Sequence, residues 1–208
     1  MPRTTVDRFE QRRATRTKLV EAALDLFSTS GYEHATVDDI AQAAGYSKGA
    51  YYFHFSTKDD ILMELLRQWT EERGRMLAGA VEDARSQAGL TAALAGFLSY
   101  EEAPRWRKVL LEFWAQATRN AEVSKRLTEA YAVWRKELAE IFEAAAKADL
   151  IAATPSELAS VALAAHDGYA VQIAIGAPGG TAMSPMQLAE SLLQTQVAGG
   201  EERQAAAR

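Results

Sequence analysis

The chain contains no cysteine, which excludes disulfide bonds and thiolate metal sites. It also lacks any run that approaches the roughly 18 consecutive apolar residues of a membrane-spanning helix. The first eighteen residues, MPRTTVDRFEQRRATRTK, lack the apolar segment of a secretory signal peptide. We therefore expect a cytoplasmic protein without a membrane partner.

The residue types on which enzymes depend are also scarce. The three histidines are His34, His54 and His166, and no two of them lie within the spacing of metal ligands. A glycine-rich phosphate loop and a thiol nucleophile are both absent. We predict that the chain is not an enzyme and that it holds no cofactor and no metal ion. The alternative is a helical small-molecule-binding protein or enzyme without sequence-specific DNA binding.

The net charge of −5 by itself argues against a nucleic-acid partner, but the distribution of charge matters more than the total. Residues 1–18 hold six basic and two acidic side chains, a balance of +4, so the remainder carries −9. A basic arm on an acidic body indicates that a polyanion is met at one end only. A basic leader with no partner is the other interpretation.

Apolar residues at helical spacing are abundant, and hydrophobic residues make up 48% of the chain. Almost every segment repeats its apolar positions with the period of a helix, and none alternates convincingly as a strand. Thr36 with Asp39, and Thr57 with Asp60, have the spacing of capping boxes, and Ser47 is placed to cap the helix between them. We expect an all-α protein.

The segment TVDDIAQAAGYSKGAYYFHF combines a short capped helix, a tight turn and a second short helix. Ala41, Ala44 and Ala50 supply small side chains where two such helices cross, and Gly45 permits the turn. This pattern is typical of a helix-turn-helix, whose second helix enters the major groove of DNA. Helical hairpins with alanine and glycine also occur in ordinary bundles, so the pattern alone leaves both interpretations open.

The longer stretch AALDLFSTSGYEHATVDDIAQAAGYSKGAYYFHFSTKDDIL resembles the N-terminal domain of the tetracycline-repressor (TetR) family of bacterial transcription regulators. The match runs from about Arg12 to about Glu72 without an insertion. The resemblance implies a three-helix DNA-binding domain joined to a larger helical domain for ligand binding and dimerisation, about nine helices in all. It also implies a homodimer that binds a palindromic operator in double-stranded DNA and is released by a small, largely hydrophobic or aromatic effector, with repression the usual outcome.

On this basis we expect four segments. These are a flexible basic arm at 1–11, a helix-turn-helix domain at 12–60 with its motif at 36–55, an effector-binding and dimerisation domain at 61–198, and a disordered tail at 199–208. The effector is expected to shift the helix that begins near residue 57 and so change the spacing of the two recognition helices.

The resemblance also assigns DNA contacts. Lys48 is the candidate for a guanine contact through O6 and N7, whereas Phe53 either contacts a thymine methyl or sugar edge or belongs to the core. Asp38 departs from the family, which commonly has a basic residue there. The positions that would contact bases or phosphates are Thr36, Ser47, Lys48, Gly49, Ala50, Tyr52, Phe53, His54 and Lys58. The positions that the family buries are Tyr46, Tyr51 and Phe55.

The middle helices are rich in large rings, which belong either to a simple core or to the effector cavity that the family places there. His166 and Asp167 face the cavity or the dimer interface, and the sequence leaves this open. A planar, aromatic or long-chain effector is favoured, and a cationic one over the ring faces is one option. The candidate effector residues are Trp106, Phe113, Trp114, Gln116, Tyr131, Trp134, His166 and Tyr169.

The last two helices have apolar residues on more than one side, and a helix of this kind needs two neighbours. The resemblance implies that they pair with their copies in a symmetric four-helix bundle. A fully buried central helix in a monomer is the alternative. The candidate interface residues are Val161, Ala164, Gly168, Val171, Ile175, Ala189, Leu192 and Leu193.

Overall fold

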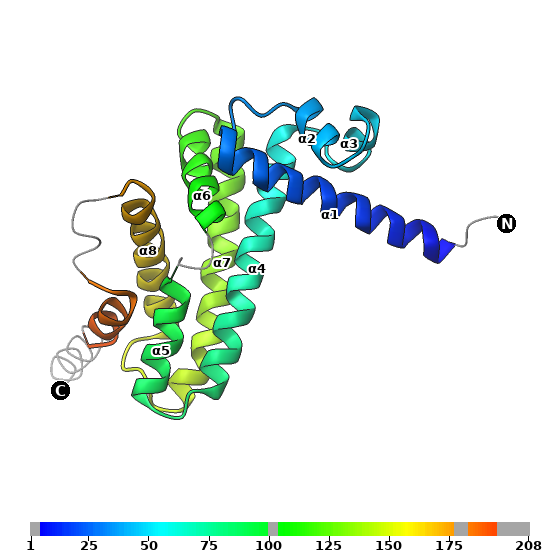
Figure 1. Ribbon diagram of the computed structural model, residues 1–208. Helices are drawn as coiled ribbons and strands as arrows, with labels where there is room; N and C mark the ends of the chain where they lie inside the picture. Colours follow the sequence, from blue (N-terminus) through cyan, green and yellow to red (C-terminus); the bar gives the residue numbers. More distant parts are fainter. Residues whose placement is uncertain (1–4, 100–103, 177–182, 195–208) are drawn as a thin grey trace. The chain divides into compact units, whose positions relative to one another are not determined.

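The computed structural model describes residues 5–99, 104–176 and 183–194, and these ranges contain nine helices and no strand (Figure 1). The all-α prediction is therefore confirmed. The helices are α1 (Thr5–Ser30), α2 (Val37–Ala43), α3 (Lys48–His54), α4 (Lys58–Asp83), α5 (Gln87–Leu98), α6 (Pro104–Ala117), α7 (Ala121–Lys147), α8 (Pro155–Ala174) and a ninth at 185–194. Among the described residues, no helix combines the length and apolar character needed to cross a membrane.

The chain divides into two compact units. Unit 1 comprises Met1–Gln68 and Pro104–Leu127, and unit 2 comprises Trp69–Ala103 and Thr128–Arg208. The boundaries fall inside α4 and α7, so each of these helices has residues in both units. This division differs from the expected boundary at residue 60, because α6 and the first turns of α7 group with the N-terminal helices.

Unit 1 is organised around α1, which packs against α2 and α6, while α2 packs against α3. Apolar side chains on the inner faces of these helices lose nearly all contact with water, and this burial is the main stabilising contribution. The core includes Leu19, Ala23, Phe27, Ile40, Ala41, Tyr51, Ile61, Leu62, Leu65, Val109 and Phe113.

The capping residues predicted for the short helices are present. Thr36 and Asp39 form a reciprocal capping box at the start of α2, and the side chain of Ser47 accepts from the Ala50 backbone N–H at the start of α3. Gly45 ends the first of these helices with φ of +78°, a left-handed conformation that residues with a Cβ rarely adopt. These local signals therefore define the helix-turn-helix.

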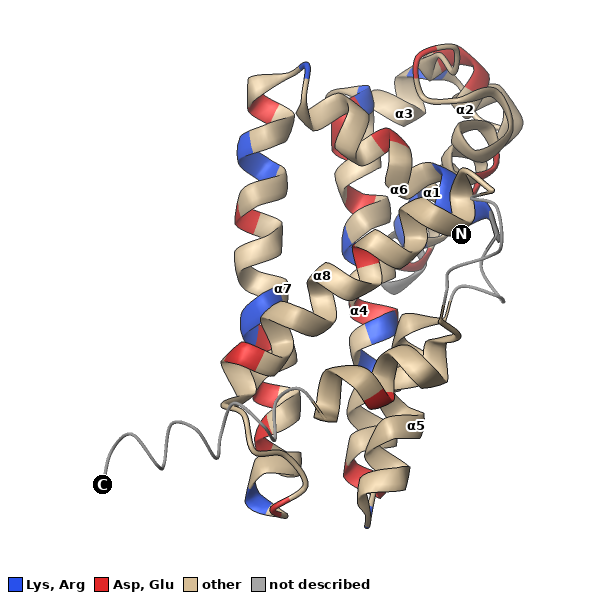
Figure 2. Cartoon of the chain, turned by 90° about the vertical axis from the view of Figure 1, so that its left-hand side faces the viewer, with Lys and Arg blue, Asp and Glu red and all other residues tan. Residues whose placement is uncertain are grey.

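Unit 2 has its core around α5, which contains no charged residue and packs against α8 (Figure 2). A helix that is apolar on most sides is expected to be buried. The core includes Leu77, Val81, Leu90, Leu94, Phe97, Leu98, Trp134, Leu138, Phe142, Leu158, Ala162, Leu163, Ala189 and Leu193.

One expectation about the N-terminus was wrong. Residues 5–11, predicted to be part of a flexible arm, belong to α1, which begins at Thr5. The segment has no glycine or proline after residue 4 and is rich in glutamate, glutamine and arginine, which propagate a helix well. Residues 1–4, the expected tail at 199–208 and the glycine-rich linker at 177–182 lie outside the described residues.

Candidate nucleic-acid interface

The short helix α3 has one buried and one exposed side. Tyr51 is fully buried and Phe55 is 3% exposed, so both lie inward as predicted. Tyr52 and Phe53, in contrast, are 50% and 63% exposed. Tyr46 is only half-buried, so its predicted burial is partial. The rings that crowd this segment therefore divide by direction, and two of them project into solvent.

The buried ring of Tyr51 fixes α3 to the next helix. Its hydroxyl donates to the backbone carbonyl of Thr57 at 2.9 Å, and burial raises the pKa of this phenol, so that it stays protonated. The Asp60 carboxylate accepts from the backbone N–H groups of Ser56 and Thr57 at 3.0 and 2.9 Å. The predicted capping box at the start of α4 is thereby present, and the loop between α3 and α4 is held at both ends.

Lys48 and Asp38 are paired across the motif. The Lys48 Nζ donates to Asp38 Oδ2 at 2.8 Å, and both side chains are more than half exposed. This hydrogen bond raises the pKa of Lys48. An exposed ion pair of this kind contributes little to stability, so a DNA base or phosphate can compete for Lys48 at small cost. The sequence singled out both residues but not their pairing.

Lys58 has partners within unit 1. Its Nζ donates to the carbonyls of Tyr32 and Ala35 at 2.6 and 3.0 Å and lies 4.1 Å from the centroid of the Tyr32 ring. Burial lowers the pKa of Lys58, although nearby carboxylates oppose the effect. Two of its three N–H groups therefore hold the loop between α1 and α2, and its phosphate contact stays a prediction.

The exposed ring of Phe53 lies between a cation and a histidine. The guanidinium carbon of Arg12, on α1, is 4.7 Å from the centroid of Phe53. The ring of His54 meets Phe53 edge-on, with centroids 5.2 Å apart. Burial lowers the pKa of His54, and the charges of Arg12 and Arg16 lower it further, so the imidazole is neutral at pH 7. A cavity of about 420 Å³ opens between α1 and α3 beside these side chains.

Glu64 forms an ion-pair network that the sequence did not indicate. Its carboxylate accepts from Arg16 of α1, from Arg67 at 2.7 and 2.9 Å, and from Gln68 at 2.9 Å. Burial alone would raise the pKa of Glu64, but these hydrogen bonds outweigh it and lower the pKa to about 2. The network joins α1 to α4 within unit 1. Arg16 lies 48 residues from Glu64 in the chain, a separation that no local pattern encodes.

Four of the predicted effector residues lie on α6 in unit 1. Phe113 is 1% exposed and belongs to the core of this unit. Gln116 is buried and donates to the Glu33 carboxylate at 2.6 Å. Trp106 and Trp114 are half-buried. Gln116 thus has a partner within unit 1, and an effector contact by these four residues stays a prediction.

The other four effector candidates lie in unit 2, where three of them meet. The Tyr131 hydroxyl donates to Asp167 Oδ2 at 2.5 Å, and the His166 Nδ1 lies 3.2 Å from Asp167 Oδ1. The rings of Trp134 and His166 meet edge-on at 5.5 Å. Burial lowers the pKa of the fully enclosed His166 and outweighs the opposite effect of Asp167, so the imidazole is neutral. Tyr169 is 9% exposed.

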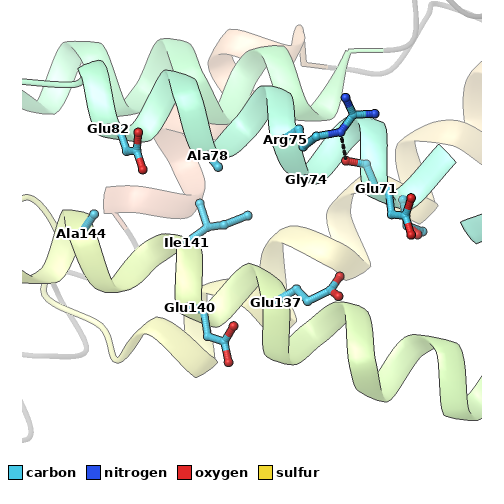
Figure 3. Close-up of a pocket in the computed structure, with 10 residues that line it drawn as sticks. Glu71, Gly74, Arg75, Ala78, Glu82, Glu137, Glu140, Ile141 and Ala144 are labelled. Carbon is cyan, nitrogen blue, oxygen red and sulfur yellow. Dashed lines mark hydrogen bonds between the residues drawn. The ribbon is translucent and has the colours of Figure 1, made fainter. Parts of the chain in front are cut away.

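Unit 2 also has a groove of about 540 Å³ between α4 and α7, which the sequence did not suggest (Figure 3). Ala78, Ile141 and Ala144 form its apolar part. One arginine lies on its α4 side, where Arg75 Nε donates to the Glu71 carbonyl at 3.3 Å. The carboxylates among the lining residues are Glu71, Glu82, Glu137 and Glu140.

The candidate interface residues divide into two groups. Five of them, on α8 and at its C-cap, form one partly or fully exposed stripe, and the C-cap residue Ile175 is 66% exposed. The stripe consists of Val161, Ala164, Gly168, Val171 and Ile175. Ala189 and Leu193 are 0% and 4% exposed, because they pack into the core of unit 2, and Leu192 packs against the same core. Their part in a dimer interface stays a prediction.

Two family comparisons cover most of the chain. Residues 19–65 match the family described as "Bacterial regulatory proteins, tetR family". Residues 84–198, more than half of the chain, match "BetI-type transcriptional repressor, C-terminal". The first match contains both helices of the motif, and the second contains α5 to α8 together with the ninth helix.

Individual relatives agree with this assignment. The chain is 45% identical over 58 residues to the Bacillus subtilis HTH-type transcriptional regulator YwcC, covering 28% of this chain and 26% of that protein. It is 30% identical over 115 residues to the Corynebacterium efficiens HTH-type transcriptional repressor AcnR, covering 55% and 57%. The chain thus spans between about a quarter and little more than half the length of these curated relatives.

Solved structures have the same fold. A transcriptional regulator from Rhodococcus sp. Rha1 is 26% identical with a TM-score of 0.65, covering 88% of this chain and 96% of that one. A regulator from Saccharomonospora viridis, solved in complex with choline, is 23% identical with a TM-score of 0.64, covering 85% and 92%. The chain therefore belongs to the TetR family of bacterial transcription regulators, with a C-terminal part of the BetI repressor type.

Proposed function

We propose that the protein is a homodimeric repressor that binds a palindromic operator when its effector site is empty. The observation that carries this proposal is the exposed face of α3, which presents Lys48, Tyr52 and Phe53 to solvent while buried Tyr51 anchors the helix. A cation with exposed rings on a rigid short helix suits the edges of bases and the adjacent phosphates in a major groove.

The roles within this face follow from chemistry. Lys48 leaves Asp38 and donates to guanine O6 and N7. Tyr52 and His54 contact backbone phosphates, which position the protein without reading the sequence. The N-terminus of α2 at Thr36 offers backbone N–H groups to a phosphate in the same way. Ser47, Gly49 and Ala50 lie in the first turn of α3, where their small size permits a close approach to the bases.

The dimer would form through the exposed apolar stripe of α8. Ile175 is 66% exposed, and Gly168 has no heavy atom within 4 Å of the position that a Cβ would occupy, so a second backbone can approach closely. A symmetric interface uses the same stripe on both copies. Dimerisation also supplies the two recognition helices that half-sites about one helical turn apart require.

The effector site would lie in unit 2, and we infer an organic cation as its ligand. The rings of Tyr131, Trp134 and His166 adjoin the Asp167 carboxylate, and aromatic faces with a nearby carboxylate favour a cationic ligand. The carboxylates that line the groove between α4 and α7 also favour a positively charged ligand. The regulator from Saccharomonospora viridis, whose structure contains choline, supports this class of ligand.

The two sites would communicate through α4. This helix begins at Lys58, directly after the loop that Tyr51 and Asp60 hold, and it runs to Asp83 in unit 2. An effector that shifts α4 changes the distance between the α3 helices of the two copies and so weakens their binding to DNA. Coupling between two sites is reciprocal, so operator DNA weakens effector binding by the same factor.

The test of DNA recognition is selection of bound duplexes from a random-sequence pool by the full chain. We expect enrichment of a palindrome whose half-sites lie about one helical turn apart. The variant Lys48→Ala should lose its preference at one guanine of each half-site, because Lys48 donates to that base. A pool that stays random after repeated selection would refute the proposal.

The effector class is tested separately by calorimetric titration of choline into the protein with and without the selected operator. Weaker binding with operator supports the coupling, and equal affinity in both titrations contradicts it. The variant Asp167→Asn should weaken choline binding if the aromatic cluster holds the cation, and Glu137→Gln should weaken it if the α4–α7 groove does. Unchanged affinity in both variants would exclude these two locations.

A further inference from the structure

Phe53 is a large apolar side chain on the exposed face of α3, and its position is set from another helix. The ring is 63% exposed, yet the Arg12 guanidinium covers it at 4.7 Å from the centroid. An exposed aromatic side chain without such a neighbour samples several rotamers, and binding then costs the entropy of selecting one. The cation over its face therefore restricts Phe53 before any DNA is bound.

Arg12 is well suited to this role because its charge is not used elsewhere. Within the part of the chain that the structure describes, no carboxylate pairs with Arg12, whereas Arg16, one turn further along α1, pairs with Glu64. The charge of Arg12 also contributes to the lowered pKa of His54, whose ring meets Phe53 edge-on. Arg12, Phe53 and His54 thus form one local cluster at the junction of α1 and α3.

The surroundings of Phe53 leave room for a ligand. The cavity of about 420 Å³ between α1 and α3 is lined by Phe53 and also by Thr15 of α1 and Ala50 of α3, both small. A thymine methyl is the apolar group that a base presents in the major groove, and an apolar side chain is its usual contact. A ring beside an open cavity fits this methyl better than it fits a charged phosphate.

We propose that Arg12 is a positioning residue that fixes the ring of Phe53 for readout of one thymine methyl in each operator half-site. This inference rests on the proposed function and adds a specificity-determining residue on α1, outside the helix-turn-helix. If Arg12 instead contacted only a phosphate, its loss would weaken binding to all sequences equally. It would also reduce the slope of log affinity against log salt concentration by about one.

The experiment measures the affinity of the full chain for the selected operator and for duplexes in which each half-site position is changed to the other three bases. The proteins are the wild type, Phe53→Ala, Arg12→Gln, Arg12→Lys and the double variant Arg12→Gln/Phe53→Ala. Arg13→Gln is the matched control, because Arg13 is the neighbouring exposed arginine of α1 and its substitution removes the same charge. The thermal midpoint of each variant shows that it is folded.

We expect Phe53→Ala to reduce the preference for thymine at one position by about fourfold, the value of one buried methyl group. Arg12→Gln should reduce the preference at the same position by about two- to fourfold, because an exposed cation–π contact is lost. Arg12→Lys should retain part of the preference. At this position the double variant should show the same base preference as Phe53→Ala alone, because Arg12 sets that preference only through the ring.

Two results would overturn the inference. One is a uniform loss of affinity in Arg12→Gln that equals the loss in Arg13→Gln, with the base preference intact. The other is a double variant whose loss of thymine preference equals the sum of the losses in the two single variants, since independent contributions add. A wild-type protein that binds every duplex equally would instead overturn the proposed function, and this inference with it.

Discussion

Glu64 of α4 pairs with Arg16 of α1 and with Arg67 of its own helix, and the variant Glu64→Gln tests how far this network stabilises unit 1. The side chain of Glu64 is 6% exposed, whereas those of Arg16 and Arg67 are 38% and 51% exposed. Glutamine preserves the shape and one acceptor oxygen but removes the charge. The variant therefore measures the electrostatic part of the network with little change in packing.

The magnitude follows from the pKa. A carboxyl whose pKa falls from 4.5 to about 2 gains at most about 3 kcal/mol of stability at neutral pH. Because water reaches both arginines, screening reduces this to about 1–2 kcal/mol. For a chain of this size, such a loss lowers the Tm by roughly 2–8 °C. The carboxylate of Glu64 is stabilised in the folded state, so its contribution is complete above pH 4.5 and is lost as the pH falls towards 2.

The assay is urea unfolding followed by circular dichroism, at pH 7 and at several values down to pH 3. Glu72→Gln is the control, because Glu72 is an exposed glutamate on the same helix. We expect Glu64→Gln to be less stable than the wild type at pH 7 and the difference to narrow as the pH falls below 4.5. Equal stability at pH 7, or a difference that stays constant to pH 3, would refute the reasoning.

Three further predictions concern the interface and the dimer. Asp38→Asn frees Lys48, so it should strengthen binding to duplexes of any sequence by severalfold at low salt, measured by fluorescence anisotropy; unchanged affinity would contradict competition between Asp38 and DNA. The lowered pKa of His54 should rise beside a phosphate, so the operator affinity should increase as the pH falls from about 7.5 to 6. The increase should be absent in His54→Gln, and the same pH dependence in both proteins would exclude His54 as the group that gains the proton. Ile175→Glu places a charge on an exposed apolar stripe, so it should convert the dimer to a monomer in analytical ultracentrifugation and weaken operator binding; an intact dimer would exclude this face.

The features that were predictable from sequence depend on neighbouring residues. The capping pairs Thr36 with Asp39 and Thr57 with Asp60 span three positions, so their spacing alone places the starts of α2 and α4. Short-range geometry of this kind is encoded in a few consecutive residues.

The features that were missed depend on residues far apart in the chain. Arg16 and Glu64 are 48 positions apart, and Arg12 reaches Phe53 from a different helix, so no local period indicates either contact. The packing of Ala189 and Leu193 into the core of unit 2 was missed for a related reason, because periodicity identifies an apolar face but not which neighbour covers it. The extent of α1 was underestimated because a polar helix has no apolar stripe by which to recognise it.

Sequence-specific DNA recognition by the exposed face of α3 is best tested by a salt titration. The affinity of the full chain for its selected operator and for a random duplex of equal length is measured between about 50 and 300 mM salt. We expect affinities that fall steeply with salt, because phosphate contacts release counterions, and at least about a thousandfold preference for the operator. Equal, weak binding to both duplexes at every salt concentration would contradict it.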